Sequence, residues 1–175
     1  QPATPDAANK QIRATALNEY RVPGAKDDVV RMFYLANITA PQAMQELLTV
    51  LRTVGRIDYI FIYTPLHAVA VRGSTNQVAL SAWMISEMDQ PPTVQRDGIH
   101  QFQSSDPAYP VARAFYLVSR TTRDLQETLT AVRSSAHIQR AFAHSSRAVL
   151  ILAGSPEQVE EAARLIAAKD RPATP

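Results

Sequence analysis

Four histidines are the first residues to consider, because an imidazole can bind a metal ion or carry a proton near neutral pH. They are His67, His100, His137 and His144. None has a second histidine or a carboxylate at the helical spacing of a metal site, and no His-Glu-x-x-His motif occurs. A zinc site needs three or four converging ligands, and without cysteine the chain has neither thiolate ligands nor disulfides. We therefore expect no metal and no other cofactor.

Motifs for a catalytic serine, for an acid–base pair of carboxylates and for phosphate binding are missing as well. The hydrolase motif Gly-x-Ser-x-Gly does not occur. The doublets Asp27-Asp28 and Glu160-Glu161 look like the flanks of helices or strands, whereas an acid–base pair needs opposed positions across a cleft. Only five glycines occur and no two are close together, which excludes the glycine-rich loops that cradle phosphate. These absences predict that the chain is not an enzyme and has no small-molecule substrate.

The charge pattern differs from that of a strongly basic, nucleic-acid-binding protein. The net charge is +2, with scattered arginines and few lysines, whereas nucleic-acid-binding proteins usually concentrate basic residues in one stripe. No run of 18 apolar residues occurs, so no helix is expected to span a membrane. We therefore expect membrane association only through a parent protein or complex.

An internal repeat organises the chain. Residues 29–91 align with residues 110–172, and most matched positions lie 81 residues apart, as Gly73 and Gly154 do. Phe33-Tyr34-Leu35 matches Phe115-Tyr116-Leu117 with a single gap near Pro41. Chance would not hold one register over some sixty positions, so the sequence predicts a duplicated module.

Each copy predicts the same order of elements. In the first copy, β-branched and aromatic residues indicate strands at 30–36, 57–63 and 68–72, and helical spacing of apolar residues indicates helices at 40–54 and near 78–88. Thr39 and Thr121 suit the first position before a helix. The predicted fold is α+β: two tandem βαββα modules, each with two helices on one face of a small three-stranded mixed sheet.

The remaining segments set the domain organisation. We expect an N-terminal extension at 1–28, partly flexible and with a short helix near 7–19, before the first module at 29–91. A linker at 92–109, with an extended piece near 99–102, precedes the second module at 110–172, and a tail covers 173–175. Because the chain begins at Gln1 without methionine, we expect a processed or trimmed piece of a longer protein. The sequence leaves open whether the modules pack together or swing on the linker.

The repeat motifs resemble those of a known family. The apolar run from Arg147 to Gly154, the following Ser155-Pro156 and the closing Leu165-Ile166 and Asp170 resemble the C-terminal half of the short periplasmic N-domains of secretins. Secretins are the outer-membrane ring channels of type II and type III secretion and of type IV pilus systems. In the first copy the resemblance covers 33–35, 69–73 and 85–89, and over both repeats it extends to about two thirds of the chain. Trp83 departs from the pattern, because the family usually has a small or polar residue there.

The resemblance implies a non-enzymatic role in protein transport. Secretin N-domains stack side by side into rings that form a periplasmic vestibule and receive inner-membrane partners or substrates. The resemblance therefore implies a protein-interaction or assembly module in a periplasmic or exported location. Such a module would bind protein partners or self-associate into a ring. The absence of cysteine fits a cytoplasmic location equally well.

The alternative is a KH-like tandem domain that binds single-stranded nucleic acid. The βαββα order and a pI near 9.1 favour this function. KH domains clamp the nucleic-acid backbone with a Gly-x-x-Gly loop, and neither copy has one.

Two segments are candidate interaction sites. Tyr59, Ile60 and Ile62 make strand 57–63 apolar on both faces, whereas the second copy has smaller and more polar residues there. We therefore expect the first module to hide more sheet surface than the second, against its neighbour or against a partner. Trp83 has Arg164 as its counterpart, and it is either an exposed interface anchor or a partly buried residue at the junction of the modules.

Overall fold

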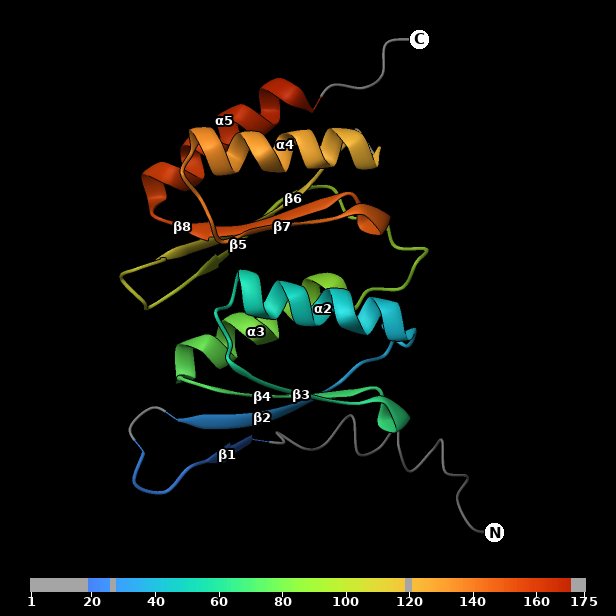
Figure 1. The fold of residues 1–175 in the computed structure, drawn as a ribbon, viewed down its shortest axis with the longest axis vertical. Coiled ribbons are helices and arrows are strands. Elements are labelled where there is room, and N and C mark those ends of the chain that lie inside the picture. The colour runs from blue at the N-terminus through green and yellow to red at the C-terminus, as the bar shows by residue number, and fades with distance from the viewer. Residues whose placement is uncertain (1–18, 26–27, 119–120, 171–175) are drawn as a thin grey trace.

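The computed structural model describes residues 19–25, 28–118 and 121–170, which stack in four layers (Figure 1). The first module comprises β1 (Glu19–Arg21), β2 (Val29–Tyr34), α2 (Pro41–Thr53), β3 (Tyr59–Tyr63), β4 (Ala68–Gly73) and α3 (Thr75–Met88). The second comprises β5 (Gly98–Gln103), β6 (Val111–Tyr116), α4 (Thr122–Ser135), β7 (Ala141–His144), β8 (Val149–Gly154) and α5 (Pro156–Lys169). Single 3₁₀ turns, η1 (Thr64–Leu66) and η2 (Ser145–Arg147), close the β3–β4 and β7–β8 hairpins.

The α+β class and the tandem modules with two helices each are confirmed. Two details of the sheets are corrected: each sheet has four strands rather than three, and every pairing is antiparallel rather than mixed. The first sheet has the order β1-β2-β4-β3 and the second β5-β6-β8-β7. β2 and β6 pair with the last strand of their hairpin, and β1 and β5 pair with their other edges, where backbone groups would otherwise lack partners.

The added strands come from segments outside the repeat. β5 covers the extended piece expected at 99–102, and β1 lies at the end of the N-terminal segment. The helix expected near 7–19 falls outside the described residues except for Glu19, which belongs to β1. The tail at 173–175 also lies outside them. Within the described part of the chain, no helix combines the length and the apolar character that crossing a membrane requires.

Side-chain caps define where three of the helices begin. Ser74 and Ser155 each accept a hydrogen bond from the backbone N–H three residues on, and the glutamine there accepts one in return from the serine N–H. Thr121 caps α4 as expected. The expectation for Thr39 is wrong, because α2 begins after Ala40 without a side-chain cap and with Pro41 at its first position. A proline there needs no partner for an N–H, so the start of this helix depends less on a cap.

The aspartate that closes each repeat ties the helix end to the loop before the first helix. The Asp89 carboxylate, directly after α3, accepts hydrogen bonds from the backbone N–H groups of Ala36, Asn37 and Ile38 at 2.7, 2.7 and 2.8 Å. Its counterpart Asp170 accepts one from the N–H of Val118 at 2.9 Å. The closing aspartate of the repeat is therefore a structural residue.

We expect Asp89→Ala to lower the free energy of unfolding by about 2 kcal/mol, because backbone donors lose a charged acceptor. Urea unfolding followed by circular dichroism measures the change. Asp97→Ala, at an exposed position between the modules, is the control and should change stability by less than about 0.5 kcal/mol. Equal effects of the two variants would contradict the structural role of the Asp89 hydrogen bonds.

Candidate protein-interaction site

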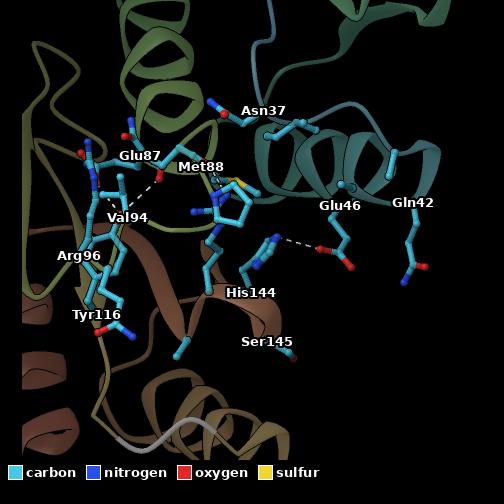
Figure 2. A pocket seen from close by; sticks show the side chains of 18 residues that line it. Asn37, Gln42, Glu46, Glu87, Met88, Val94, Arg96, Tyr116, His144 and Ser145 are labelled. Carbon is cyan, nitrogen blue, oxygen red and sulfur yellow. Dashed lines mark hydrogen bonds and ion pairs between the residues drawn. The ribbon is translucent and has the colours of Figure 1, made fainter.

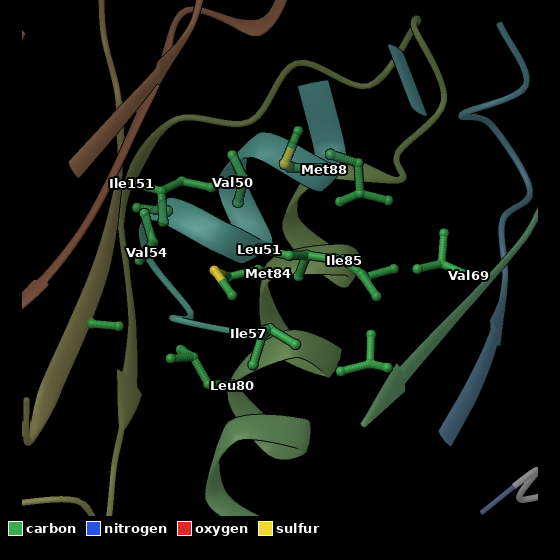
Figure 3. Close-up of a cluster of buried hydrophobic side chains, with 14 of the residues drawn as sticks. Val50, Leu51, Val54, Ile57, Val69, Leu80, Met84, Ile85, Met88 and Ile151 are labelled. Atoms are coloured by element: carbon green, nitrogen blue, oxygen red, sulfur yellow. The ribbon is translucent and has the colours of Figure 1, made fainter. Parts of the chain in front are cut away.

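The two modules share one hydrophobic core. Helices α2 and α3 lie between the two sheets (Figure 1), and their buried side chains form one cluster with residues of the second sheet. Ile151 of β8 lies beside Val50 of α2 and Val54, the residue directly after this helix (Figure 3). All six residues of β8 are buried, because α4 and α5 cover the other face of the same sheet. The modules are thus packed together, which settles the question that the sequence left open.

A buried carboxylate holds one side of this junction. Glu87 of α3 is only 7% exposed, and its Oε2 lies 2.7 Å from the Tyr116 hydroxyl, 2.6 Å from Arg96 Nη1 and 2.8 Å from His100 Nδ1. Burial by itself raises the pKa of Glu87, but the hydrogen bonds from these three side chains outweigh it and hold the pKa below its ordinary value. Burial, helped by Glu87, raises the pKa of Tyr116, so the phenol remains a donor.

A histidine and a glutamate hold the opposite side. Nε2 of His144, in β7, lies 2.8 Å from Oε2 of Glu46, in α2 (Figure 2). Burial lowers the pKa of His144 although the Glu46 charge opposes it, so we assign a neutral ring that donates its Nε2 proton to Glu46. That tautomer leaves Nδ1 as an acceptor, and this atom is buried without a hydrogen-bond partner in the described structure.

Because the pKa of His144 lies below its ordinary 6.5 in the folded chain, the unfolded chain takes up this proton first. We expect the neutral ring's contribution to stability to be complete above about pH 6.5 and to be lost as the pH falls through the folded-state pKa. Urea unfolding between pH 7.5 and 5 tests this.

His144→Gln keeps an N–H donor for Glu46 but cannot titrate, so it should reduce the dependence of stability on pH in that range. His137→Gln, at an exposed position, should leave the dependence unchanged. A wild-type stability that is flat between pH 7.5 and 5 would contradict the assignment.

Further contacts fix the junction along its length. The Asn76 side chain donates to Ser104 Oγ at 2.9 Å and accepts from the Ser105 N–H at 3.0 Å. The Arg140 guanidinium donates to the Val54 carbonyl at 2.8 Å and lies over the Tyr109 ring, 3.4 Å from its centre. Polar groups from both modules therefore surround the shared core.

A cleft of about 580 Å³ opens at the junction (Figure 2). Its ionisable lining residues are Glu46, Glu87, Arg96, Tyr116, His144 and Arg147. Both carboxylates are already paired, and Arg147 donates to the Gln90 and Pro91 carbonyls. No group of three histidine, aspartate or glutamate residues in the described ranges could hold a metal ion. The charged groups of this cleft join the modules, and their pairing leaves little to act on a substrate.

The outer face of the first sheet, in contrast, exposes aromatic side chains. Neighbouring residues of a strand point to opposite faces, so β3 directs alternate side chains outward. Tyr59, Phe61 and Tyr63 are 67%, 64% and 45% exposed, and Tyr20 of β1 is 60% exposed. We call these four residues, with Tyr34 of β2 on the same side, the aromatic face.

The strand register arranges the aromatic face in three rows across the sheet. The first row is Tyr20, Val30, Arg72 and Tyr59, the second is Met32, Ala70 and Phe61, and the third is Tyr34, Ala68 and Tyr63. Arg72 is the one charged side chain in these rows. It is paired with Asp28, and its guanidinium lies 5.3 Å from the centre of the Tyr59 ring. The face is therefore largely apolar, and its rings stand toward the edges of the sheet.

The structure separates the residues that the sequence singled out. Tyr59 lies on the aromatic face, whereas Ile60 and Ile62 pack against the core beneath it. Trp83 is partly buried at the junction, with its ring 5.9 Å from that of Phe102 in β5. This is the second of the two positions that the sequence allowed for it.

Packing between the modules by itself hides more of the second sheet than of the first, so the expectation that the first module hides more sheet surface now depends on a partner. Among the described residues, the second sheet is covered on both faces and the first sheet on one. The prediction relied on the apolar content of strand 57–63. That strand gives no information on the small residues Ala112 and Ala114, which let α2 and α3 approach the second sheet closely. Phe61 and Tyr63 were not singled out, although the alternation of aromatic and aliphatic residues over 59–63 already placed them beside Tyr59 on one face.

Comparison with known proteins finds solved structures that are similar to the chain at low sequence identity. No protein-family model matches the chain, and no curated protein matches it. Among solved structures, it is similar to the N-terminal domain of the secretin XcpQ from Pseudomonas aeruginosa, with 14% identity and a TM-score of 0.32 over 81% of this chain and 62% of that one. It is also similar to a structure of XcpQN012, with 16% identity and a TM-score of 0.34 over 86% and 64% of the two chains. The chain thus spans less than two thirds of either neighbour's length, and its function must be inferred from its own residues.

Proposed function

We propose that the chain is a non-enzymatic protein-interaction module of the secretin N-domain type. In this proposal it acts in the periplasm or another exported location and joins protein partners, or further copies of itself, into an assembly such as a ring. Contact with a membrane comes through the parent protein or complex. The repeat motifs support the relation to secretin N-domains, and the surface of the first module supports the interaction role.

The aromatic face is the observation that carries the proposal. Soluble proteins rarely leave a contiguous apolar patch of this kind in water, and such a patch marks an interaction site. Tyrosine is common at interfaces because it combines a large apolar ring with a hydroxyl that can bond to a partner. Four of the five residues of the aromatic face are tyrosines.

The distribution of polar groups supports the same role. The buried or partly buried ionisable side chains Glu87, Arg96, Tyr116 and His144 bond to one another or to the facing module. They stabilise a stack of modules that, in the part of the chain that the structure describes, presents an exposed aromatic sheet face at one end. Such an arrangement suits a structural element of an assembly.

The test is the size of the assembly that contains this chain in its source cells. Gentle extracts are separated by size-exclusion chromatography at the natural expression level. We expect the wild-type chain to elute in a particle larger than the chain itself. Phe61→Ser should shift elution toward the 19.3 kDa monomer, because it removes one ring from the middle row of the aromatic face.

Val118→Ser is the matched control, because Val118 is similarly exposed on the second module, outside the aromatic face. It should elute with the wild type. Elution of the wild-type chain as a monomer would overturn the proposal. A large particle that dissolves on nuclease treatment would instead support the nucleic-acid alternative.

A further inference from the structure

The internal repeat provides a covered version of the aromatic face. On the second sheet the corresponding three rows begin with Phe102, His100 and Gly98 of β5. The middle row continues through Ala114 and Ile151 to Phe142, the counterpart of Phe61, and the last row through Tyr116 and Val149 to His144. Four of the five residues of the aromatic face thus have a counterpart in this sheet whose surroundings the structure already gives, and the fifth, Tyr59, aligns with Arg140 directly before β7.

In the second sheet these counterparts contact the helix pair α2–α3. Phe102, in the place of Tyr20, lies against Trp83. Tyr116, in the place of Tyr34, donates its hydroxyl to Glu87 at 2.7 Å. His144, in the place of Tyr63, pairs with Glu46. A layer of two helices therefore covers the face through apolar packing in the centre and polar contacts at the edges.

The two faces share the property that lets helices lie across them. Each face has two alanines on one of its two central strands, Ala68 and Ala70 on β4 in the first sheet and Ala112 and Ala114 on β6 in the second, where Val149 and Ile151 take the places of Ala68 and Ala70. Larger rings stand at the edges in both sheets. Small central residues permit the backbone of a helix to approach a sheet closely, whereas the rings can enclose its flanks.

The outer helices of this chain lack the chemistry needed to cover such a face. The positions in α4 and α5 that correspond to Val54, Leu80 and Trp83 hold Ser135, Glu161 and Arg164. Ser135 and Arg164 are exposed. Terminal repeats of stacked proteins carry a polar outer face of this kind, which stops further stacking. A second copy of the chain that docked through α4–α5 would bury charged groups against rings.

We infer that the aromatic face is covered by a pair of amphipathic helices from another protein module, packed as α2–α3 pack on the second sheet. This inference rests on the proposed interaction function and names the chemistry of the partner. The partner's helices carry aliphatic or aromatic residues toward Ala70 and Phe61, and an acidic side chain toward the Tyr34 hydroxyl. The stack then gains a further layer at the first sheet and remains closed at α4–α5.

Site-specific photo-crosslinking in the source cells tests the inference. The photoreactive analogue p-benzoylphenylalanine replaces one residue at a time in the full chain, at Phe61, Phe142 or Arg164. Phe142 is the positive control, because it packs against the first-module core and should form an internal link to α2. Arg164 reports on the polar outer helices. Mass spectrometry then identifies the peptide linked to each position.

We expect the probe at Phe61 to link to another protein module through a helical segment with apolar residues every three to four positions. A link from Phe61 to a β-strand peptide of any chain, including β3 of a second copy, would overturn the inference and leave the interaction function standing. The same holds for a link to α4 or α5 of a second copy, or for intermolecular links from Arg164 alone. If only the internal link from Phe142 formed, both the inference and the proposed function would fail.

Discussion

Replacing Ile151 with alanine is expected to lower the free energy of unfolding by about 2–5 kcal/mol, the usual cost of removing a buried aliphatic side chain. Ile151 is fully buried and lies in the second sheet where Val50 and Val54 of the first module reach it (Figure 3). The alanine would leave a cavity between the modules. Urea unfolding, followed by circular dichroism and by Trp83 fluorescence, measures both stability and cooperativity.

Ile99→Ala is the matched control, because Ile99 is 57% exposed on β5. It should change stability by less than about 0.5 kcal/mol. Similar small losses in both variants would mean that the modules do not share a core in solution. We also expect circular dichroism and Trp83 fluorescence to report one unfolding transition for the wild type, since Trp83 lies at the junction.

Replacing Glu87 with alanine is expected to cost about 3 kcal/mol, because it leaves the partly buried partners of a buried carboxylate without their acceptor. The Tyr116 hydroxyl would lose its acceptor and Arg96 its counter-ion. Thermal and urea unfolding at pH 7 measure the loss. Glu127→Ala is the control: Glu127 is exposed and pairs with Arg123 on the surface of α4, so removing it should cost at most about 0.5 kcal/mol.

The effect of Glu87→Ala should depend on pH. The pKa of Glu87 lies below its ordinary 4.5 in the folded chain, so its carboxylate stabilises the fold fully above that pH. Its contribution is lost as the pH falls through the lower, folded-state pKa. The difference in stability between wild type and variant should therefore shrink in acid. A difference that stays constant down to pH 3 would contradict the role of the charged carboxylate.

The repeat made most of the fold predictable from sequence. Local signals were strong in both copies: the Gly-Ser turns before α3 and α5, the apolar stripes of the helices and the closing Asp89 and Asp170 all lie where the alignment placed them. The short strand β1 escaped prediction because three residues are too few to show an alternating pattern. Its pairing depends on the open edge of β2, which only the assembled sheet provides.

The junction could not be predicted, because its contacts join residues far apart in sequence. Glu87 meets Tyr116, and Glu46 meets His144, only when the second sheet lies across α2 and α3. The apolar character of 59–63 showed that this strand has two apolar faces. Which sheet lies inside the stack depends on the packing of α2 and α3 against both sheets.

Hydroxyl-radical footprinting can show whether a partner covers the aromatic face, by comparing this face with the covered face of the second sheet. The oxidation rates of Phe61 and its counterpart Phe142, and of the exposed Tyr63 and the covered Tyr116, are measured in the purified chain and in the assembly isolated from its source cells. We expect Phe61 and Tyr63 to react rapidly in the purified chain and to become protected in the assembly, while Phe142 and Tyr116 react slowly in both. Equal oxidation of Phe61 in the two samples would contradict the claim that the aromatic face binds a partner.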